Sequence, residues 1–403
     1  MSLEKVYIPY GGYWSTPFTK WQGSFSSLHP LKFAAEAAGK ALAERAISVD
    51  GFTSLYSGMT IPAKHALYAS PWLAGMLGAE KLTGPMFSQA CATSARVLGS
   101  AAFEVEAANG AAPNILCITA DRTSNGPHVL YPNPLAPGGR GDAEDWVWDN
   151  FNFDPFAHNS MIQAAENVAR EQKITTEEQH QVVLMRHAQY QQALDDDAAF
   201  HKRYMLSEVE VNPSGRKVLA TVTGDEGIFA TTAEGLARLK PVLPEGSVTF
   251  GGQTFPADGN AGMIVTTQEQ ARSMSRDPKI EIKILSFAEG RAEKAFMPKA
   301  NAPAVRRVLE QAGLALKDMA AIKTHNPFAV NDIYLSRELG IPLEGMNNYG
   351  SSLIWGHPQG PTGMRLIIEL IEELVVLGGG YGLFTGCAAG DTAAARVLEV
   401  KVS

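Results

Sequence analysis

The chain has 403 residues, 45% of them hydrophobic and 19% charged, and its formal net charge is −8. This composition fits a globular protein of two or three packed units, and the lack of lysine or arginine runs argues against nucleic acid or an anionic membrane as a partner. Three sparse cysteines without CxxC spacing argue against a disulfide framework or a structural zinc site. The N-terminus lacks a signal-peptide pattern and the longest apolar stretches are interrupted, so we expect a cytoplasmic protein.

An α/β pattern occurs twice along the chain. The order strand, helix, strand is predicted at residues 5–13, 30–46 and 51–59, and again at residues 280–290, 303–316 and 319–328. Strands that alternate with helices of this length predict mostly parallel sheets joined by crossover helices. The sequence therefore predicts two similar α/β halves.

A segment of different composition separates the two halves. It starts with a Pro- and Gly-rich stretch, passes through the aromatic run "DWVWDNFNFDPF" and then becomes helical. Long insertions of this kind are more often functional than decorative. We expect an inserted loop subdomain at residues 122–249, an N-terminal half made of residues 1–121 and 250–276, and a C-terminal half at residues 277–403.

Cys91 directly precedes a predicted helix at residues 92–110. The unpaired N–H groups and the dipole at a helix N-terminus stabilise a thiolate, so we expect the pKa of Cys91 to be lowered. A buried structural thiol is the alternative, and this segment alone does not decide between them. Cys117 lies in the apolar strand "NILCITA" and is expected in the core.

Two of the nine histidines follow elements that α/β folds use for chemistry. His325 comes directly after a predicted strand, and His357 lies in a Gly- and Pro-rich turn immediately before a helix. Either histidine alone would be read as a loop residue with ordinary hydrogen bonds. A thiolate becomes a catalyst only when a base and an oxyanion hole accompany it.

Four patterns resemble the thiolase family, and together they extend over almost the whole chain. They are "CATS" from Cys91, "HNPFAVND" from His325, "GHPQGPTGMR" from Gly356 and "GCAAGD" around Cys387. The leading histidine of the second pattern is similar to the sterol-carrier-type thiolases. The resemblance implies the thiolase fold, an α/β fold with two βαβαβ-type halves, a five-layer α-β-α-β-α core and the inserted subdomain.

The resemblance also implies an activity, that of an acyl-CoA C-acyltransferase which makes or cleaves a 3-ketoacyl-CoA. Coenzyme A would be a substrate, with no permanently bound cofactor and no metal. Cys91 would be the nucleophile that is acylated, and His357 would take its proton. Cys387 would be the acid/base at the α-carbon, His325 with an ordered water would stabilise the enolate, and the N–H of Ala389 would belong to the oxyanion hole. Two anions and two proton transfers in a Claisen reaction require this larger set of groups.

The resemblance assigns the binding of CoA and of the acyl group to Met161, Thr254 and Phe328. Ser160 precedes Met161 where members specific for short chains often have histidine. Ala389 stands where the family usually has glycine. These departures leave the acyl chain length open.

The resemblance implies a homodimer or a dimer of dimers, in which the strand at residues 114–120 would pair with its two-fold mate. Two alternatives to an active thiolase remain at this point. One is a ketoacyl synthase of the same superfamily, which would not need Cys387. The other is a catalytically weakened thiolase-like subunit that binds acyl-CoA or lipid and acts with an accessory partner.

Overall fold

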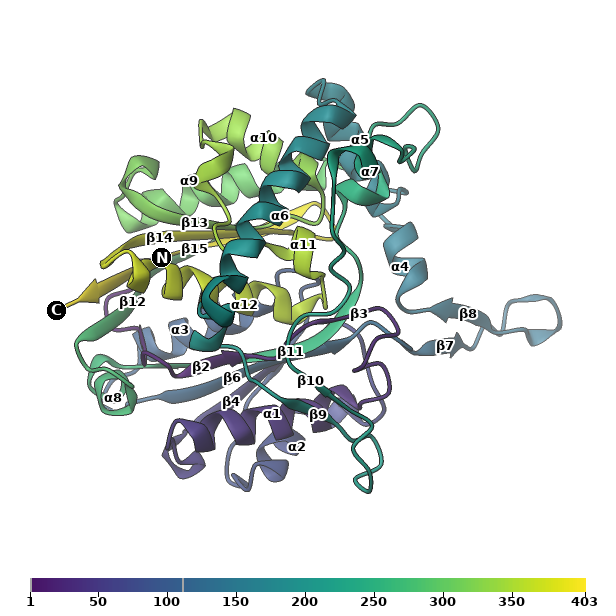
Figure 1. Ribbon diagram of the computed structural model, residues 1–403. Helices are drawn as coiled ribbons and strands as arrows, with labels where there is room; N and C mark the ends of the chain where they lie inside the picture. Colours follow the sequence, from purple (N-terminus) through teal and green to yellow (C-terminus); the bar gives the residue numbers. More distant parts are fainter. Residues whose placement is uncertain (1, 111) are drawn as a thin grey trace.

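Helices and strands stack in five layers in the computed structural model, which describes residues 2–110 and 112–403 (Figure 1). The outer helices are α1 (Pro30–Glu44) and α2 (Ala69–Met76) on one side and α9 (Asn301–Ala312) and α10 (Ala329–Leu339) on the other. The middle layer holds α3 (Thr93–Ala107) and α12 (Gly360–Val376), which contact each other and the sheets on both sides. The predicted five-layer architecture is therefore confirmed.

The strands form one hydrogen-bonded path in which a short strand links two sheets. The strands of this path are β1 (Tyr7–Ile8), β4 (Ser54–Gly58), β5 (Met86–Phe87), β6 (Asn114–Arg122), β11 (Ala257–Thr266), β12 (Ile280–Arg291), β13 (Met319–His325), β14 (Gly379–Ala388) and β15 (Thr392–Val402). Their spatial order is β13-β14-β15-β12-β1-β11-β6-β4-β5, and β2 (Tyr13–Ser15) and β3 (Thr19–Lys20) pair with β11. The two copies of the repeat therefore share one order, β4-β6-β11-β1 and β13-β14-β15-β12.

The expectation of mostly parallel sheets is wrong. Within the described residues the parallel pairs of the path are β4 with β5, β4 with β6, and β13 with β14. The pairs β6 with β11, β14 with β15 and β12 with β15 are antiparallel. A turn of only three residues joins β14 to β15, and a connection this short permits antiparallel pairing alone.

The expectation that residues 114–120 pair with a second copy of the chain is also wrong. These residues lie in β6, which is paired with β11 on one side and with β4 on the other. Both edges of β6 are filled, so it has no backbone groups to offer a partner. The strand at the end of the path is β5, which pairs with β4 alone among the described strands.

The insertion covers one side of the core. It contains β7 (His128–Tyr131), β8 (Asp142–Asp145), α4 (Trp148–Asn152), α5 (Met161–Glu171), α6 (Thr176–Ala198), β9 (Val209–Val211), β10 (Ala220–Val222) and α7 (Ala233–Ala237). The β7–β8 hairpin projects away from the body (Figure 1). Two buried ion pairs attach the insertion to the core, Arg186 with Asp332 of α10 and Asp225 with Arg365 of α12. Buried charges of this kind require their partners, so these pairs fix the position of the insertion.

Two further α-helices are short. They are α8 (Gln268–Met274), which follows β11, and α11 (Ser352–Trp355), which precedes the turn before α12. None of the helices in the described part of the chain is long and apolar enough to cross a bilayer.

Candidate active site

Cys91 lies at the N-terminal end of α3, in the middle layer. Ala90 before it has a φ of 44°, a strained value for a residue other than glycine, and the helix begins two residues after the thiol. Strain of this kind is concentrated at functional sites. Gly58, on the neighbouring strand β4, lies against Thr93, where an added Cβ would come within 2.7 Å of that side chain. The half-buried thiol is thereby held where β4 and α3 meet.

His357 faces the thiol from the C-terminal half. Its Nε2 lies 3.1 Å from the Cys91 sulfur, and its Nδ1 lies 2.6 Å from Thr362 Oγ1. Gly356 before it has a φ of 91°, and an added Cβ would come within 2.7 Å of Phe255, so a side chain here would displace the histidine. The imidazole is buried and fixed at both nitrogens, which makes Nε2 available as a base toward the thiol.

Gln359 and Asp121 complete this turn, and the sequence analysis did not single them out. Gln359 Oε1 lies 3.4 Å from the Cys91 sulfur, and its φ of 62° indicates strain. The carboxylate of Asp121, near the end of β6, accepts a hydrogen bond of 2.8 Å from the N–H of Gly360. An added Cβ at Gly360 would approach that carboxylate to 2.7 Å. Asp121 thus fastens the turn of the C-terminal half to the N-terminal half beside Cys91.

His325 lies at the end of β13, and its ring centroid is 4.2 Å from that of His357. Its Nδ1 is 2.8 Å from Ser352 Oγ, which donates its own proton to Asn326 Oδ1 at 3.2 Å. The proton of the neutral imidazole therefore lies on Nδ1, which leaves Nε2 as an acceptor. This Nε2 is buried and has no hydrogen-bond partner among the described residues. A water molecule could donate one proton to Nε2 and the other to an anion in the site.

Cys387 and Ala389 enter the site from the end of β14. Gly386 pairs with His325 in the parallel register of β13 and β14, so Cys387 follows directly beside that histidine. The amide of Asn331 donates a hydrogen bond of 3.2 Å to the Cys387 sulfur. The backbone N–H groups of Ala389 and of Cys91 itself reach the Cys91 sulfur. The structure thus brings together all five residues that the sequence analysis assigned to the chemistry.

In the resting site neither of the two thiols and neither of the two imidazoles carries a charge. Burial raises the pKa of the Cys91 thiol to about 12 and raises that of Cys387 well above its usual value. Burial lowers the pKa of His325 to about 3, and burial together with the nearby His325 lowers the pKa of His357 well below 6.5. The expected lowering of the pKa of Cys91 is therefore wrong, because desolvation outweighs the helix N-terminus and the two N–H groups. Both thiols are protonated and both imidazoles are neutral.

The three residues assigned to CoA and acyl binding lie around this cluster in different ways. Thr254 donates its hydroxyl proton to the carbonyl of Ser352, next to His325, and its N–H binds the carbonyl of Pro327. Phe328, the residue after Pro327, is buried. Met161 begins α5 and lines a small cavity with Gly390, the residue after Ala389. Thr254 keeps its side-chain proton within the protein, so it offers a ligand only the remaining acceptor capacity.

The donor atoms of Cys91, His325 and His357 lie within 4.8 Å of one another. One sulfur and two imidazole nitrogens at this spacing are a ligand set that Zn²⁺ or a similar borderline-soft cation accepts. A cation there would occupy the thiol and the base at once. Any such metal would therefore block the reaction of Cys91 rather than assist it.

Iodoacetamide near neutral pH is expected to label Cys91 predominantly. Cys117 and Cys387 are buried, whereas Cys91 is half-buried and has a base within hydrogen-bonding distance. Peptide mapping after a brief incubation of the folded protein measures this. Predominant labelling of Cys117 would overturn the assignment of both thiols.

The rate of that alkylation should hardly change between about pH 6 and pH 8.5. Transfer of the thiol proton to His357 leaves the total number of bound protons unchanged, so the reactive fraction is constant between the lowered pKa of His357 and the raised pKa of Cys91. A series of alkylation rates in buffers of constant ionic strength measures it. A rate that rose about tenfold per pH unit would indicate an isolated thiol instead.

Comparison with known proteins gives matches along nearly the whole chain. The family model "Thiolase, N-terminal domain" matches residues 13–269, and "Thiolase, C-terminal domain" matches residues 278–400. The 3-oxoadipyl-CoA/3-oxo-5,6-dehydrosuberyl-CoA thiolase of Escherichia coli K12 is 29% identical over 329 residues, which are 79% of this chain and 80% of the relative. An acetyl-CoA acetyltransferase of Syntrophomonas wolfei is 27% identical over 410 residues, covering 99% and 100%. The crystal structure of the Bacillus anthracis acetyl-CoA acetyltransferase superposes with a TM-score of 0.89, at 25% identity and 99% coverage of each chain.

Proposed function

The chain belongs to the thiolase family, and from that premise we propose that it makes or cleaves 3-ketoacyl-CoA through an acyl-enzyme on Cys91. The observation that supports this proposal most is the Cys91 sulfur 3.1 Å from His357 Nε2 with a second thiol, Cys387, in the same cluster. A nucleophile with its own base and a separate proton donor is what a carbon–carbon cleavage next to a thioester requires.

In thiolysis the Cys91 sulfur attacks the 3-keto carbon, and its proton passes to His357 Nε2. The bond between C2 and C3 then breaks, and its electron pair leaves as the enolate of the shorter thioester. The Cys387 thiol protonates C2 and becomes a thiolate, which the amide of Asn331 stabilises. An acyl group remains on Cys91.

The second half of the reaction restores every proton. The thiolate of Cys387 takes the proton of incoming CoA, whose sulfur attacks the acyl group on Cys91. The Cys91 sulfur leaves and recovers its proton from His357. The N–H groups of Ala389 and Cys91 stabilise the tetrahedral anion, and a water held by His325 Nε2 stabilises the enolate. Both thiols and both imidazoles are neutral at rest and the site is buried, so N–H donors stabilise a developing anion more strongly there than they would in water.

Coenzyme A is the substrate that this proposal requires, and Met161, Thr254 and Phe328 are the residues we assign to it. The segment of Thr254 is held to that of His325 through Ser352 and Pro327, so a bound thioester would lie against both.

The histidine at position 325 supports a place near the sterol-carrier-type thiolases. We also assign the N-terminal half to residues 1–121 and 250–276, the inserted subdomain to residues 122–249 and the C-terminal half to residues 277–403, and we propose a cytoplasmic location.

A thiolysis assay tests the proposal. The protein is mixed with free CoA and a series of 3-ketoacyl-CoA esters of increasing length, and loss of the enolate absorbance is followed. We expect loss that depends on CoA with at least one ester. Absence of turnover with every ester would favour a catalytically weakened binding subunit, and condensation that required a malonyl donor would favour a ketoacyl synthase.

A homodimer is expected in solution. The outer edge of β5 is unpaired among the described strands, and Met86 on it is 46% exposed. Antiparallel pairing of two such edges would close a sheet across the two-fold axis. The exposed Leu130 and Leu135 of the β7–β8 hairpin support association into a dimer of dimers. Light scattering at micromolar concentration should give at least twice the mass of one chain, and a stable monomer would contradict this.

A further inference from the structure

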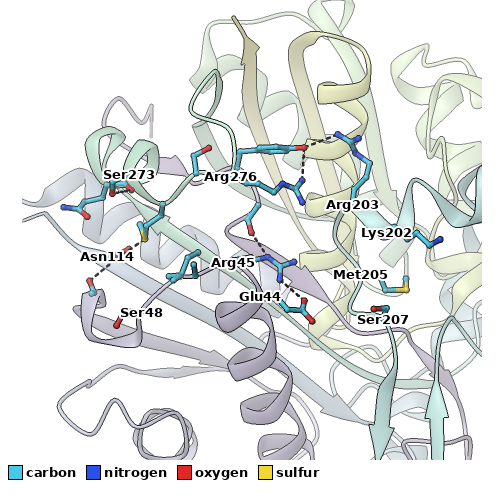
Figure 2. Close-up of a pocket in the computed structure, with 18 residues that line it drawn as sticks. Glu44, Arg45, Ser48, Asn114, Lys202, Arg203, Met205, Ser207, Ser273 and Arg276 are labelled. Carbon is cyan, nitrogen blue, oxygen red and sulfur yellow. Dashed lines mark hydrogen bonds and ion pairs between the residues drawn. The ribbon is translucent and has the colours of Figure 1, made fainter.

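A second cavity lies far from Cys91. It has a volume of about 700 Å³ and lies between the C-terminal end of α1, the segment after α6 and the helix α8 (Figure 2). Asn114, the first residue of β6, lines it, whereas Asp121 near the other end of the same strand lies beside the catalytic turn. Seven residues of extended strand correspond to roughly 20 Å. The cavity is therefore separate from the site of Cys91 and opens at the opposite end of the sheet.

Three guanidinium groups donate hydrogen bonds to two consecutive residues of this cavity, Tyr10 and Gly11. Arg203 and Arg276 both donate to the hydroxyl oxygen of Tyr10, at 3.2 and 3.0 Å. Arg45 Nε donates to the carbonyl of Gly11, the next residue, at 2.7 Å. Figure 2 shows Arg203 and Arg276 pointing toward the same oxygen, with Arg45 approaching from α1. Two cations thus share one neutral acceptor and a third lies close by.

The charge of the lining is positive although the chain as a whole has a formal net charge of −8. The charged residues that line the cavity are Glu44, Arg45, Lys202, Arg203 and Arg276, four cations and one carboxylate. Arg45 pairs with Glu44 at 3.8 Å, Arg203 pairs with Glu372, and Lys202 pairs with Asp197. Within the part of the chain that the structure describes, no carboxylate lies within 4.0 Å of Arg276.

Arg45 and Arg276 lie close enough in this cavity to repel each other. Burial lowers the pKa of Arg45; Glu44 opposes this, and Arg276 lowers the pKa further by a smaller amount. An anion placed between the guanidinium groups would reverse that contribution, because opposite charges favour the charged form. Arg276 is therefore the cation of this lining that a bound anion would pair with, since Arg45, Lys202 and Arg203 already face carboxylates.

We propose that this cavity, the Tyr10 pocket, binds a small organic phosphate. Arg45 and Arg203 already use their Nε groups, on Gly11 and Glu372, so the donors that they can turn to a ligand are Nη groups. Arg45, Arg203 and Arg276 reach the cavity from three separate segments, and Ser48 and Ser207 also line it. A phosphate, with its oxygens in several directions, accepts donors that are not parallel. The volume is that of a site for a molecule the size of a mononucleotide.

Calorimetric titration with inorganic diphosphate and with ADP tests the proposal on the intact protein. Wild-type protein should bind both, and ADP more tightly, because it fills more of the volume. Arg276→Gln should raise the Kd for diphosphate by roughly tenfold or more, the effect of losing a charge-assisted hydrogen bond. The control Arg272→Gln lies in α8, four residues before Arg276, and is absent from the lining, so its Kd should match wild type. Equal binding by Arg276→Gln and wild type, or no binding by wild type, would overturn the proposal.

Two further titrations distinguish this pocket from the site of CoA and from a carboxylate site. Diphosphate should bind wild-type protein saturated with CoA as it binds free protein, since the Tyr10 pocket and Cys91 are separate. Displacement by CoA would place the diphosphate in the active site and overturn the proposal. Citrate should bind more weakly than diphosphate. Binding of citrate in preference to diphosphate would show that the ligand class is wrong.

Discussion

Cys91→Ser is expected to abolish both acyl-enzyme formation and turnover. A serine hydroxyl ionises far less readily than a thiol, and His357, whose pKa burial lowers, is too weak a base to ionise it. Protein incubated with radiolabelled acetyl-CoA and quenched in acid should carry no covalent label, and thiolysis should fall to background.

Cys117→Ala provides the matched control for this variant. It also removes one thiol, but this thiol is buried in β6 and outside the cluster of Cys91, His325, His357 and Cys387. The control should therefore take up label as wild type does, even if its stability falls because of the cavity it leaves. Label retained by the Cys91→Ser protein would show that another group is the nucleophile.

Cys387→Ser should separate acylation from carbon–carbon chemistry. The variant should still accept an acetyl group on Cys91, because the Cys91–His357 pair is intact. It should lose thiolysis by roughly two to four orders of magnitude, the usual contribution of a positioned general acid or base. The serine hydroxyl is a much weaker acid than the thiol it replaces, so it protonates the α-carbon poorly.

Exchange of the α-protons of acetyl-CoA with deuterated water gives an independent readout of the same variant. Wild-type protein should catalyse the exchange, and Cys387→Ser should not, while both take up the acetyl label. A Cys387→Ser protein with wild-type thiolysis and exchange would show that this thiol is structural. It would then favour the binding-subunit alternative.

Periodicity and turn residues predict where helices and strands lie along the chain. They do not predict the direction of a strand in the sheet or which strands are its neighbours. The two strand-helix-strand repeats are present as β1-α1-β4 and β12-α9-β13. The direction of β11 and β15 was mistaken, because a strand's direction depends on the connection that returns it to the sheet. The position of β6 between two neighbours was missed for the same reason, since the sequence does not state which strand lies at an edge.

The active-site residues that lie in a sequence motif could be predicted. Their hydrogen-bond partners could not, because those contacts depend on how distant segments pack. Cys91, His325, His357, Cys387 and Ala389 were found from the four patterns, and the structure places them together. Gln359 contacts Cys91, and Asp121 contacts Gly360, only because the two halves pack against each other. Ser352 contacts His325, and Asn331 contacts Cys387, because separate segments of the C-terminal half come together in the fold.

Charge states were the least predictable feature, because burial cannot be read from spacing. The position of Cys91 at the N-terminus of α3 predicted a thiolate with a lowered pKa, but burial raises the pKa of this thiol instead. His201 lies next to Lys202 and Arg203 in the sequence, yet it is 4% exposed and burial lowers its pKa. In both places the sequence shows only the neighbours along the chain. The segments that bury the side chain, and so shift its pKa, come from elsewhere in the fold.

The central claim is that Cys91 cleaves a carbon–carbon bond and retains the acyl fragment. Wild-type protein mixed with a 3-ketoacyl-CoA in the absence of free CoA, quenched in acid and mapped by mass spectrometry, tests it directly. We predict one acyl group, two carbons shorter than the substrate chain, on the peptide that carries Cys91, with an equal amount of acetyl-CoA released. Intact substrate with no acylated peptide, or an acyl group on a residue other than Cys91, would contradict the account.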